Sequence, residues 1–134
     1  MITAVDTSVA VAAFAPWHEH HQAALAAARD AHLPAHCGIE TYSTLTRLPE
    51  PFRATGSVVA EYLRRRFADR WLFPSATMTR DLPSELAHLA IIGGASYDAL
   101  IASTVRDNDA LLKTIDRRAQ PTYRALGVSF EHIG

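Results

Sequence analysis

Cysteine is nearly absent from this chain, and so are long apolar runs and an excess of charge of either sign. Cys37 is the single cysteine among 134 residues, so no internal disulfide can form and a reducing cytoplasm is the expected compartment. No stretch approaches the roughly 18 apolar residues of a membrane-spanning helix, so no contact with a membrane is expected. The formal net charge is −1, which excludes an overall basic field that attracts nucleic acid. Any RNA must therefore be bound by a local group of basic side chains.

What the chain does contain is a regular alternation of short apolar runs and helical segments. The apolar runs predict strands at residues 2–5, 33–37, 71–74, 111–115 and 128–133. Helical spacing predicts helices at 8–14, 18–31, 38–48, 57–67, 82–92, 97–105 and 117–126. Strands that alternate with helices form parallel sheets covered on both faces. We therefore expect a single α/β domain over residues 1–134, with a mainly parallel sheet of about four or five strands flanked by helices on both faces.

Two acidic residues follow predicted strands directly. Asp6 ends the run ITAV and Asp116 ends the run LLKTI. The carboxyl ends of parallel strands meet at one edge of a sheet, which is where α/β domains build their functional sites. Each aspartate also has an ordinary explanation as the N-terminal cap of the helix that follows it.

Two further acids, Glu40 and Asp98, fall in the first turns of predicted helices. Alone, each is explained by the helix dipole, which favours negative charge there. Together with Asp6 and Asp116 they would form one group of carboxylates, whose mutual repulsion a divalent cation relieves. Oxygen ligands without cysteine or histidine favour Mg²⁺ or Mn²⁺ over zinc.

The segments around these acids resemble the four motifs of the PIN-domain family, and more closely those of VapC-type toxins from VapBC toxin–antitoxin pairs. The segments are AVDTSV, GIETYSTLTRLP, SYDALIASTVRDN and LLKTIDRRA, in this order, and the resemblance covers nearly the whole chain. It implies a PIN-like domain with endoribonuclease activity that depends on one or two Mg²⁺ or Mn²⁺ ions. Four acids would be catalytic and bind the metal: Asp6, Glu40, Asp98 and Asp116. Three hydroxyl groups would be secondary polar groups near it: Thr7, Ser8 and Thr114.

The resemblance also implies partners. They are an RNA substrate, a small VapB-like antitoxin and a second copy of the chain in a homodimer. Exposed apolar residues such as Trp17, Phe52 and Trp71 would serve protein contacts, although burial in the core is the default for each. One position departs from the family pattern, because many PIN domains carry a further acid where this chain has Ala119. That departure leaves the number of metal ions open.

The implied reaction is hydrolysis of an RNA phosphodiester by metal-activated water, which leaves 5′-phosphate and 3′-hydroxyl ends. Arg117 and Arg118 stand next to Asp116, so we expect them to contact a phosphate. The run from Arg64 to Arg66 is more visible in the sequence, but a solvated helix face explains it.

Two other groups suggest sites and are discounted. The run from His18 to His21 lacks the H-E-x-x-H spacing of a zinc site, and we expect a solvated helix start there. Cys37 is expected to be a buried, inert thiol, with His36 pointing to the other side of the same strand.

Three alternative interpretations fit parts of the sequence. A phosphoaspartate-type phosphatase needs a second aspartate where the chain has Ser8, and a receiver domain needs an acid pair beside Asp6. A non-catalytic RNA-binding or interaction domain of the same fold would not need all four acids. In a purely structural protein the acids would be helix caps, and Asp6→Asn would cost little beyond about 1 kcal/mol of stability.

Overall fold

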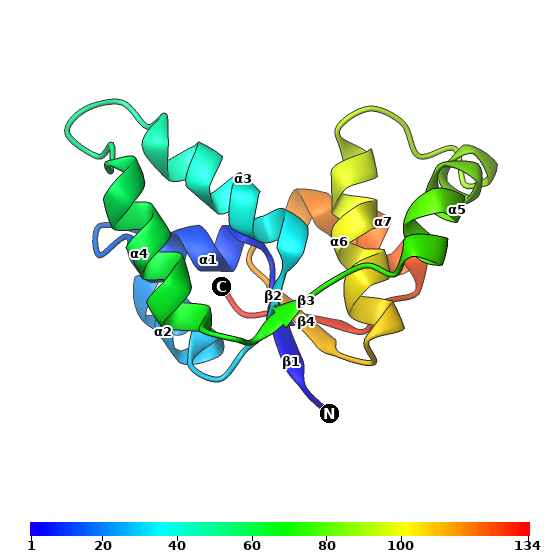
Figure 1. Cartoon of the computed structure of the whole chain (residues 1–134), viewed down its shortest axis with the longest axis horizontal. Coiled ribbons are helices and arrows are strands. Elements are labelled where there is room, and N and C mark those ends of the chain that lie inside the picture. Colours follow the sequence, from blue (N-terminus) through cyan, green and yellow to red (C-terminus); the bar gives the residue numbers. More distant parts are fainter.

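Parallel strands lie at the centre of the computed structural model, which describes residues 1–134, and helices surround them (Figure 1). The strands are β1 (Thr3–Val5), β2 (Leu33–Pro34), β3 (Trp71–Leu72), β4 (Leu111–Thr114) and β5 (Phe130–His132). One sheet has the order β1-β4-β5 and the other consists of β2 and β3, with every pairing parallel. A single parallel bridge between Ala4 and His32 joins the two sheets. The strands thus follow each other in the order β3-β2-β1-β4-β5.

Helices cover the strands from two sides. They are α1 (Thr7–Phe14), α2 (His21–Ala28), α3 (Ala35–Thr46), α4 (Gly56–Phe67), α5 (Ala76–His88), α6 (Ala95–Asp107), the 3₁₀ helix η1 (Arg117–Ala119) and α7 (Gln120–Leu126). Figure 1 shows α1 to α4 on one side of the strands and α5, α6 and α7 on the other. The predicted α/β architecture is confirmed, although its main sheet has only three strands. None of the helices has the length and apolar character needed to cross a membrane.

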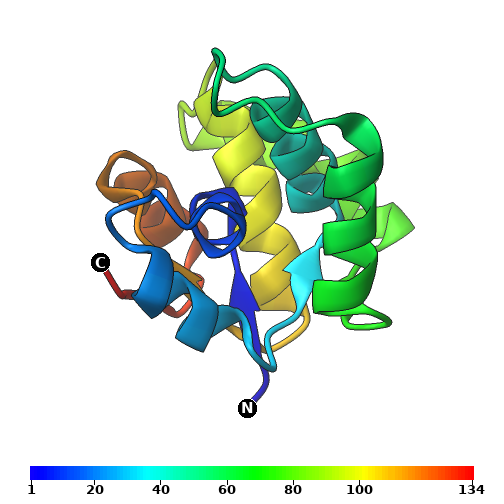
Figure 2. The same cartoon turned by 90° about the vertical axis from the view of Figure 1, so that its left-hand side faces the viewer.

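The core around β1 places the first acid inside the protein. Ala4 and Val5 of β1 are fully buried, and so are Val9 and Ala10 of α1. Figure 2 shows β1 leading from the N-terminus straight into α1. Asp6 is the one residue between these two buried elements, so its side chain starts from within the core.

The predicted boundary between β2 and α3 is wrong, and the observed boundary adds a contact to the candidate site. β2 ends at Pro34, and residues 35–37 begin α3 instead of continuing the strand. Proline has no N–H for a further strand pairing, and its restricted φ suits the residue that precedes a helix. His36 therefore lies on the same helix as Glu40, one turn earlier, and not on a strand. Cys37 is buried as predicted, and burial raises the pKa of its thiol.

Helix starts account for the other errors. α4 begins at Gly56, one residue before the predicted start, and Thr55 caps it, because its hydroxyl accepts the N–H of Val58 at 3.4 Å. α6 begins at Ala95, two residues before the predicted start. α5 begins at Ala76, about two turns before the predicted start, and contains Pro83. Proline is disfavoured inside a helix, which is why the local pattern predicted a later start.

Candidate active site

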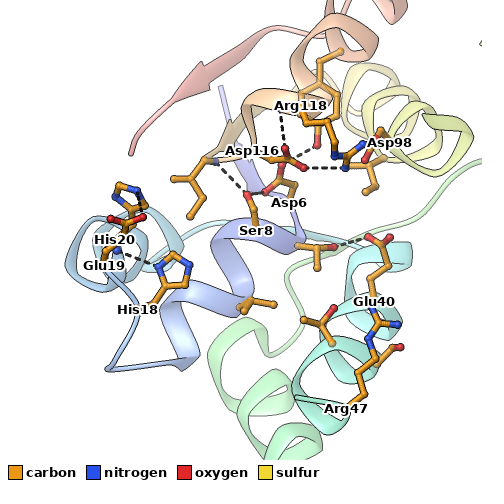
Figure 3. Close-up of a pocket in the computed structure, with 17 residues that line it drawn as sticks. Asp6, Ser8, His18, Glu19, His20, Glu40, Arg47, Asp98, Asp116 and Arg118 are labelled. Atoms are coloured by element: carbon orange, nitrogen blue, oxygen red, sulfur yellow. Dashed lines mark hydrogen bonds and ion pairs between the residues drawn. The ribbon is translucent and has the colours of Figure 1, made fainter. Parts of the chain in front are cut away.

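A pocket of about 660 Å³ lies at the carboxyl ends of β1 and β4, and all four predicted acids line it. Asp6 follows β1 and Asp116 follows β4, while Glu40 comes from α3 and Asp98 from α6. Figure 3 shows Asp6 and Asp116 at the centre of the pocket, with Glu40 on the α3 wall and Asp98 on the α6 side. The fold therefore gathers four acids that are widely separated along the chain.

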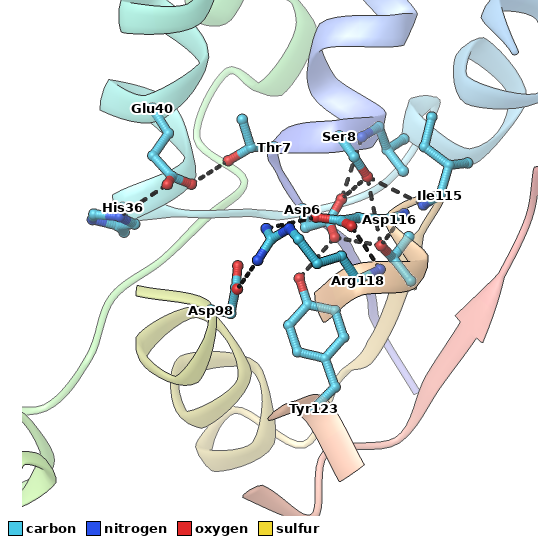
Figure 4. Close-up of polar contacts among 12 residues, drawn as sticks. Asp6, Thr7, Ser8, His36, Glu40, Asp98, Ile115, Asp116, Arg118 and Tyr123 are labelled. Atoms are coloured by element: carbon cyan, nitrogen blue, oxygen red, sulfur yellow. Dashed lines mark hydrogen bonds and ion pairs between the residues drawn. The ribbon is translucent and has the colours of Figure 1, made fainter. Parts of the chain in front are cut away.

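Asp6 is the most deeply buried of the four, with 2% of its surface exposed. It caps α1, because its Oδ1 accepts the backbone N–H of Val9 at 3.3 Å. Ser8 donates its hydroxyl to Oδ1, while Thr114 and Tyr123 donate theirs to Oδ2, the last at 2.8 Å (Figure 4). Burial raises the pKa of Asp6 above its usual range, and these hydrogen bonds partly offset that increase.

Two of these hydroxyl groups also tie β1 to β4. The Ser8 Oγ accepts the backbone N–H of Ile115 at 3.1 Å, and the Thr114 Oγ1 accepts that of Asp116 at 3.0 Å. Each hydroxyl thus donates to the Asp6 carboxylate and accepts from the chain just after β4. The position of Asp116 relative to Asp6 is set by these bonds. Ser8 and Thr114 lie beside Asp6, where the motif resemblance places secondary polar groups.

Asp98 and Asp116 are joined by the guanidinium group of Arg118. Its Nη1 lies 3.3 Å from the Asp98 Oδ2, and its Nη2 lies 3.1 Å from the Asp116 Oδ2. Partial burial raises the pKa of Asp98, and the Arg118 charge works against that shift. The Arg118 side chain is 70% exposed, so it can leave without disturbing the core. Its neighbour Arg117 is exposed and does not line the pocket.

Glu40 has its own set of contacts. Thr7 donates its hydroxyl to the Glu40 Oε1 at 2.6 Å, and the His36 Nε2 lies 3.4 Å from Oε2. The His36 contact could not be predicted from a strand over residues 33–37. It follows from the four-residue helical spacing once α3 begins at Ala35. Arg47, the residue that follows α3, also lines the pocket.

The histidine-rich run contributes to the pocket too. α2 begins at His21, so residues 18–20 form part of the loop after α1 instead of a helix start. His18, Glu19 and His20 line the pocket, which corrects their assignment to a solvated helix start. His18 accepts the backbone N–H of His20 at its Nδ1, at 3.1 Å. Burial and the neighbouring His20 lower the pKa of His18.

The chemistry of the donor set fits a hard divalent cation, because the pocket offers five carboxylates, those of the four predicted acids and of Glu19, and no thiolate. In the present arrangement, however, no three histidine, cysteine, aspartate or glutamate side chains form a group that could hold a metal ion. Asp6 is engaged by hydroxyl groups, and the Arg118 guanidinium balances the charge of Asp98 and Asp116. The four acids could share one cation only after Arg118 has moved away from the two aspartates.

The fold and the pocket define a class: a parallel α/β domain with an acidic site at the carboxyl ends of its strands. The PIN domain family model matches residues 3–124. Ribonuclease VapC40 of Mycobacterium tuberculosis is 46% identical over 131 residues, which cover 97% of this chain and 98% of that protein. Ribonuclease VapC27 of the same organism is 46% identical over 127 residues, 93% of this chain and 92% of that protein. The chain belongs to the PIN-domain family, as its four motifs predict.

Two solved structures share the fold. FitAB bound to an IR36 DNA fragment aligns with a TM-score of 0.70 at 20% identity, over 98% of this chain and 94% of that one. FitAcB from Neisseria gonorrhoeae aligns with a TM-score of 0.68 at 23% identity, over 97% of this chain and 96% of that one. At these identities the likeness establishes a common architecture.

Proposed function

We propose that the protein is a Mg²⁺- or Mn²⁺-dependent endoribonuclease that acts as the toxin of a type II toxin–antitoxin pair in the cytoplasm. The observation that carries the proposal is the single pocket that contains Asp6, Glu40, Asp98 and Asp116. The family match over residues 3–124 includes all four acids. Two relatives at 46% identity carry the name ribonuclease, which supports RNA as the substrate.

In this proposal the four acids hold one or two ions. A bound Mg²⁺ or Mn²⁺ would lower the pKa of water and offset the charge of the reacting phosphate. The protein supplies orientation: three hydroxyl groups and the Val9 N–H fix the Asp6 carboxylate, and Thr7 fixes Glu40. Because the RNA 2′-hydroxyl is not the nucleophile, we expect products with 5′-phosphate and 3′-hydroxyl ends.

Arginines of the pocket provide the local positive charge that the net charge of −1 does not. Arg118 is the best placed, since it already binds two anionic groups and could bind a phosphate with the same two nitrogens. Arg47 lines the pocket from the α3 side. Arg117 is exposed and does not line the pocket, so it would contact a more distant phosphate. Arg64 and Arg65 both pair with Glu61 on the exposed face of α4, as a solvated helix face requires.

We further propose a VapB-like antitoxin and a homodimer as protein partners. Trp17 and Phe52 are 50% and 46% exposed, and their ring centroids lie 4.8 Å apart. Such an exposed aromatic pair is suited to a protein contact. Trp71 is better explained by the core, because its ring packs directly over Gly38, where a Cβ atom would lie 2.5 Å from it.

The decisive test compares the wild-type chain with Asp98→Asn on RNA. We expect the wild type to cleave RNA with Mg²⁺ or Mn²⁺, and we expect chelator or Asp98→Asn to reduce cleavage at least about a hundredfold. Mapping of RNA ends after expression in cells gives the second measurement, with 5′-phosphate ends expected. Asp107→Asn, at the exposed end of the same helix, is the matched control. Cleavage that persists in chelator, or cyclic phosphate ends, would refute the mechanism.

A further inference from the structure

Tyr97 and His36 form a stacked aromatic pair beside the acidic pocket. Their ring centroids lie 5.3 Å apart, and their planes differ by 3°. Tyr97 is nevertheless 56% exposed, although one face of its ring is covered by His36. A flat aromatic surface is therefore held in a defined orientation and open to solvent.

Both rings belong to the helices that supply acids to the pocket. Tyr97 immediately precedes Asp98 in α6, and His36 lies one turn before Glu40 in α3. The His36 Nε2 is 3.4 Å from the Glu40 Oε2. Figure 4 shows His36 next to Glu40, with Asp98 across the gap between the two helices. The stacked pair thus bridges the two helices that carry Glu40 and Asp98, next to the residues that line the pocket.

We infer that the Tyr97 ring is a stacking platform for a nucleobase of the RNA strand. This inference rests on the proposed ribonuclease function and extends it to how the substrate is held. Bases stack on aromatic side chains whatever their identity, because every base has a π face. His36 holds the Tyr97 ring in advance, so little side-chain freedom is lost when a base binds. A base stacked on Tyr97 would place its nucleotide beside Asp98, next to the pocket where we propose that the phosphodiester is cleaved.

The shape of this site favours a nucleotide over a protein chain. A protein interface buries a broad apolar centre, whereas the pocket beside Tyr97 is lined mainly by polar and charged residues. A nucleotide needs one flat apolar face for its base next to one charged site for its phosphate. Tyr97 and the acidic pocket with Arg118 provide these two features side by side.

The test uses short single-stranded oligoribonucleotides that carry one 2-aminopurine, whose fluorescence falls when it stacks. All variants are made in the Asp98→Asn background so that the RNA is not consumed. Tyr97→Phe keeps the ring, Tyr97→Leu keeps apolar bulk without the ring, and Tyr97→Ala removes both. Phe73→Ala, an aromatic residue that is 67% exposed outside the pocket, is the matched control.

We expect Tyr97→Ala and Tyr97→Leu to weaken RNA binding about tenfold and to lose the fluorescence quenching at one 2-aminopurine position. Tyr97→Phe and Phe73→Ala should keep both signals. Equal binding and quenching in all variants would overturn the platform. An equal loss in Tyr97→Phe and Tyr97→Ala would also overturn it, because the hydroxyl group and not the ring would then be responsible. Normal RNA binding by Tyr97→Ala, combined with loss of a co-expressed protein partner, would assign the ring to a protein interface instead.

Cleavage assays on chains with native Asp98 separate this inference from the proposed function. If the wild type cleaves RNA and Tyr97→Ala raises KM while kcat is retained, both proposals are supported. If the wild type cleaves RNA and Tyr97→Ala has an unchanged KM, only the platform fails. If the wild type neither binds nor cleaves RNA, the ribonuclease proposal fails and the platform fails with it.

Discussion

The two sides of the acidic pocket stabilise their carboxylates in different ways. On the β1 side, Asp6 is 2% exposed, and uncharged hydroxyl and N–H groups surround it. On the α6 side, Asp98 and Asp116 share the guanidinium group of Arg118, whose side chain is 70% exposed. The first arrangement is part of the core, whereas in the second an exposed guanidinium group covers two partly buried carboxylates.

This difference separates a fixed part of the site from an exchangeable part. Removing a hydrogen bond to Asp6 leaves a buried carboxylate without one of its donors, which lowers the free energy of unfolding. Breaking the Arg118 contacts frees a guanidinium group that water can solvate, so it costs less than breaking the contacts of Asp6. Asp6 is thus suited to define where a cation binds, and Arg118 is suited to give way to that cation.

The largest effect should come from weakening the fixed side with Tyr123→Phe. This change removes one donor to the Asp6 carboxylate, so we expect the free energy of unfolding to fall by about 2 kcal/mol near pH 7. Because the pKa of Asp6 is raised in the folded protein, folding favours its protonated form, and the contribution of Asp6 to stability increases as the pH falls. The lost hydrogen bond acts mainly on the ionised form. The difference in the free energy of unfolding between the wild type and Tyr123→Phe should therefore become smaller as the pH falls to about 4.

Urea unfolding in chelator at both pH values measures this prediction. Tyr62→Phe is the control, because the Tyr62 hydroxyl donates to the neutral Ala10 carbonyl at 2.7 Å. It should cost about 1 kcal/mol with no such pH dependence. If Tyr123→Phe lowers the free energy of unfolding by the same amount at both pH values, the loss does not depend on the charge of Asp6.

A smaller effect, on the exchangeable side, is expected from Arg118→Ala. Removal of the guanidinium frees Asp98 and Asp116, so we expect the affinity for Mn²⁺ to rise about fivefold, equivalent to about 1 kcal/mol for two ion pairs made by an exposed guanidinium. RNA cleavage should fall at the same time, because the proposed phosphate contact is lost. Calorimetric titration of Mn²⁺ measures the first effect. Arg117→Ala, outside the pocket, should leave Mn²⁺ affinity unchanged while weakening RNA binding. Unaltered Mn²⁺ affinity in Arg118→Ala would contradict the idea that a cation replaces the Arg118 guanidinium at Asp98 and Asp116.

The smallest effect is expected from Thr7→Val, which removes the donor to Glu40 and keeps the branched shape of the side chain. Glu40 is partly exposed, so the free energy of unfolding should fall by only about 0.5–1 kcal/mol, with a few-fold loss of cleavage. Thr46→Val is the control, because its hydroxyl bonds the Tyr42 carbonyl at the exposed end of the same helix as Glu40. Thermal unfolding compares the two. If Thr46→Val proves as harmful to cleavage, the Thr7 contact has no special role.

The acids could be found from the sequence because each stands next to a recognisable boundary. Asp6 and Asp116 follow apolar strands, and parallel strands place such residues at one edge. Glu40 and Asp98 carried weak signals alone and gained weight only through the ordered set of four motifs. The roles of Tyr123 and His36 could not be found in this way. Tyr123 contacts Asp6 across 117 positions of sequence, and the His36 contact depends on where α3 begins.

Local pattern was thus enough for the α/β class, the parallel strands, the family and the four acids that the fold gathers in one pocket. Apolar periodicity and short motifs depend on neighbours a few residues apart, and those neighbours are visible in the chain itself. Only the folded structure decided which groups compensate each charge: hydroxyl groups for Asp6, and Arg118 for Asp98 and Asp116. These partners are set by the packing of distant segments around a buried core, which no local spacing encodes.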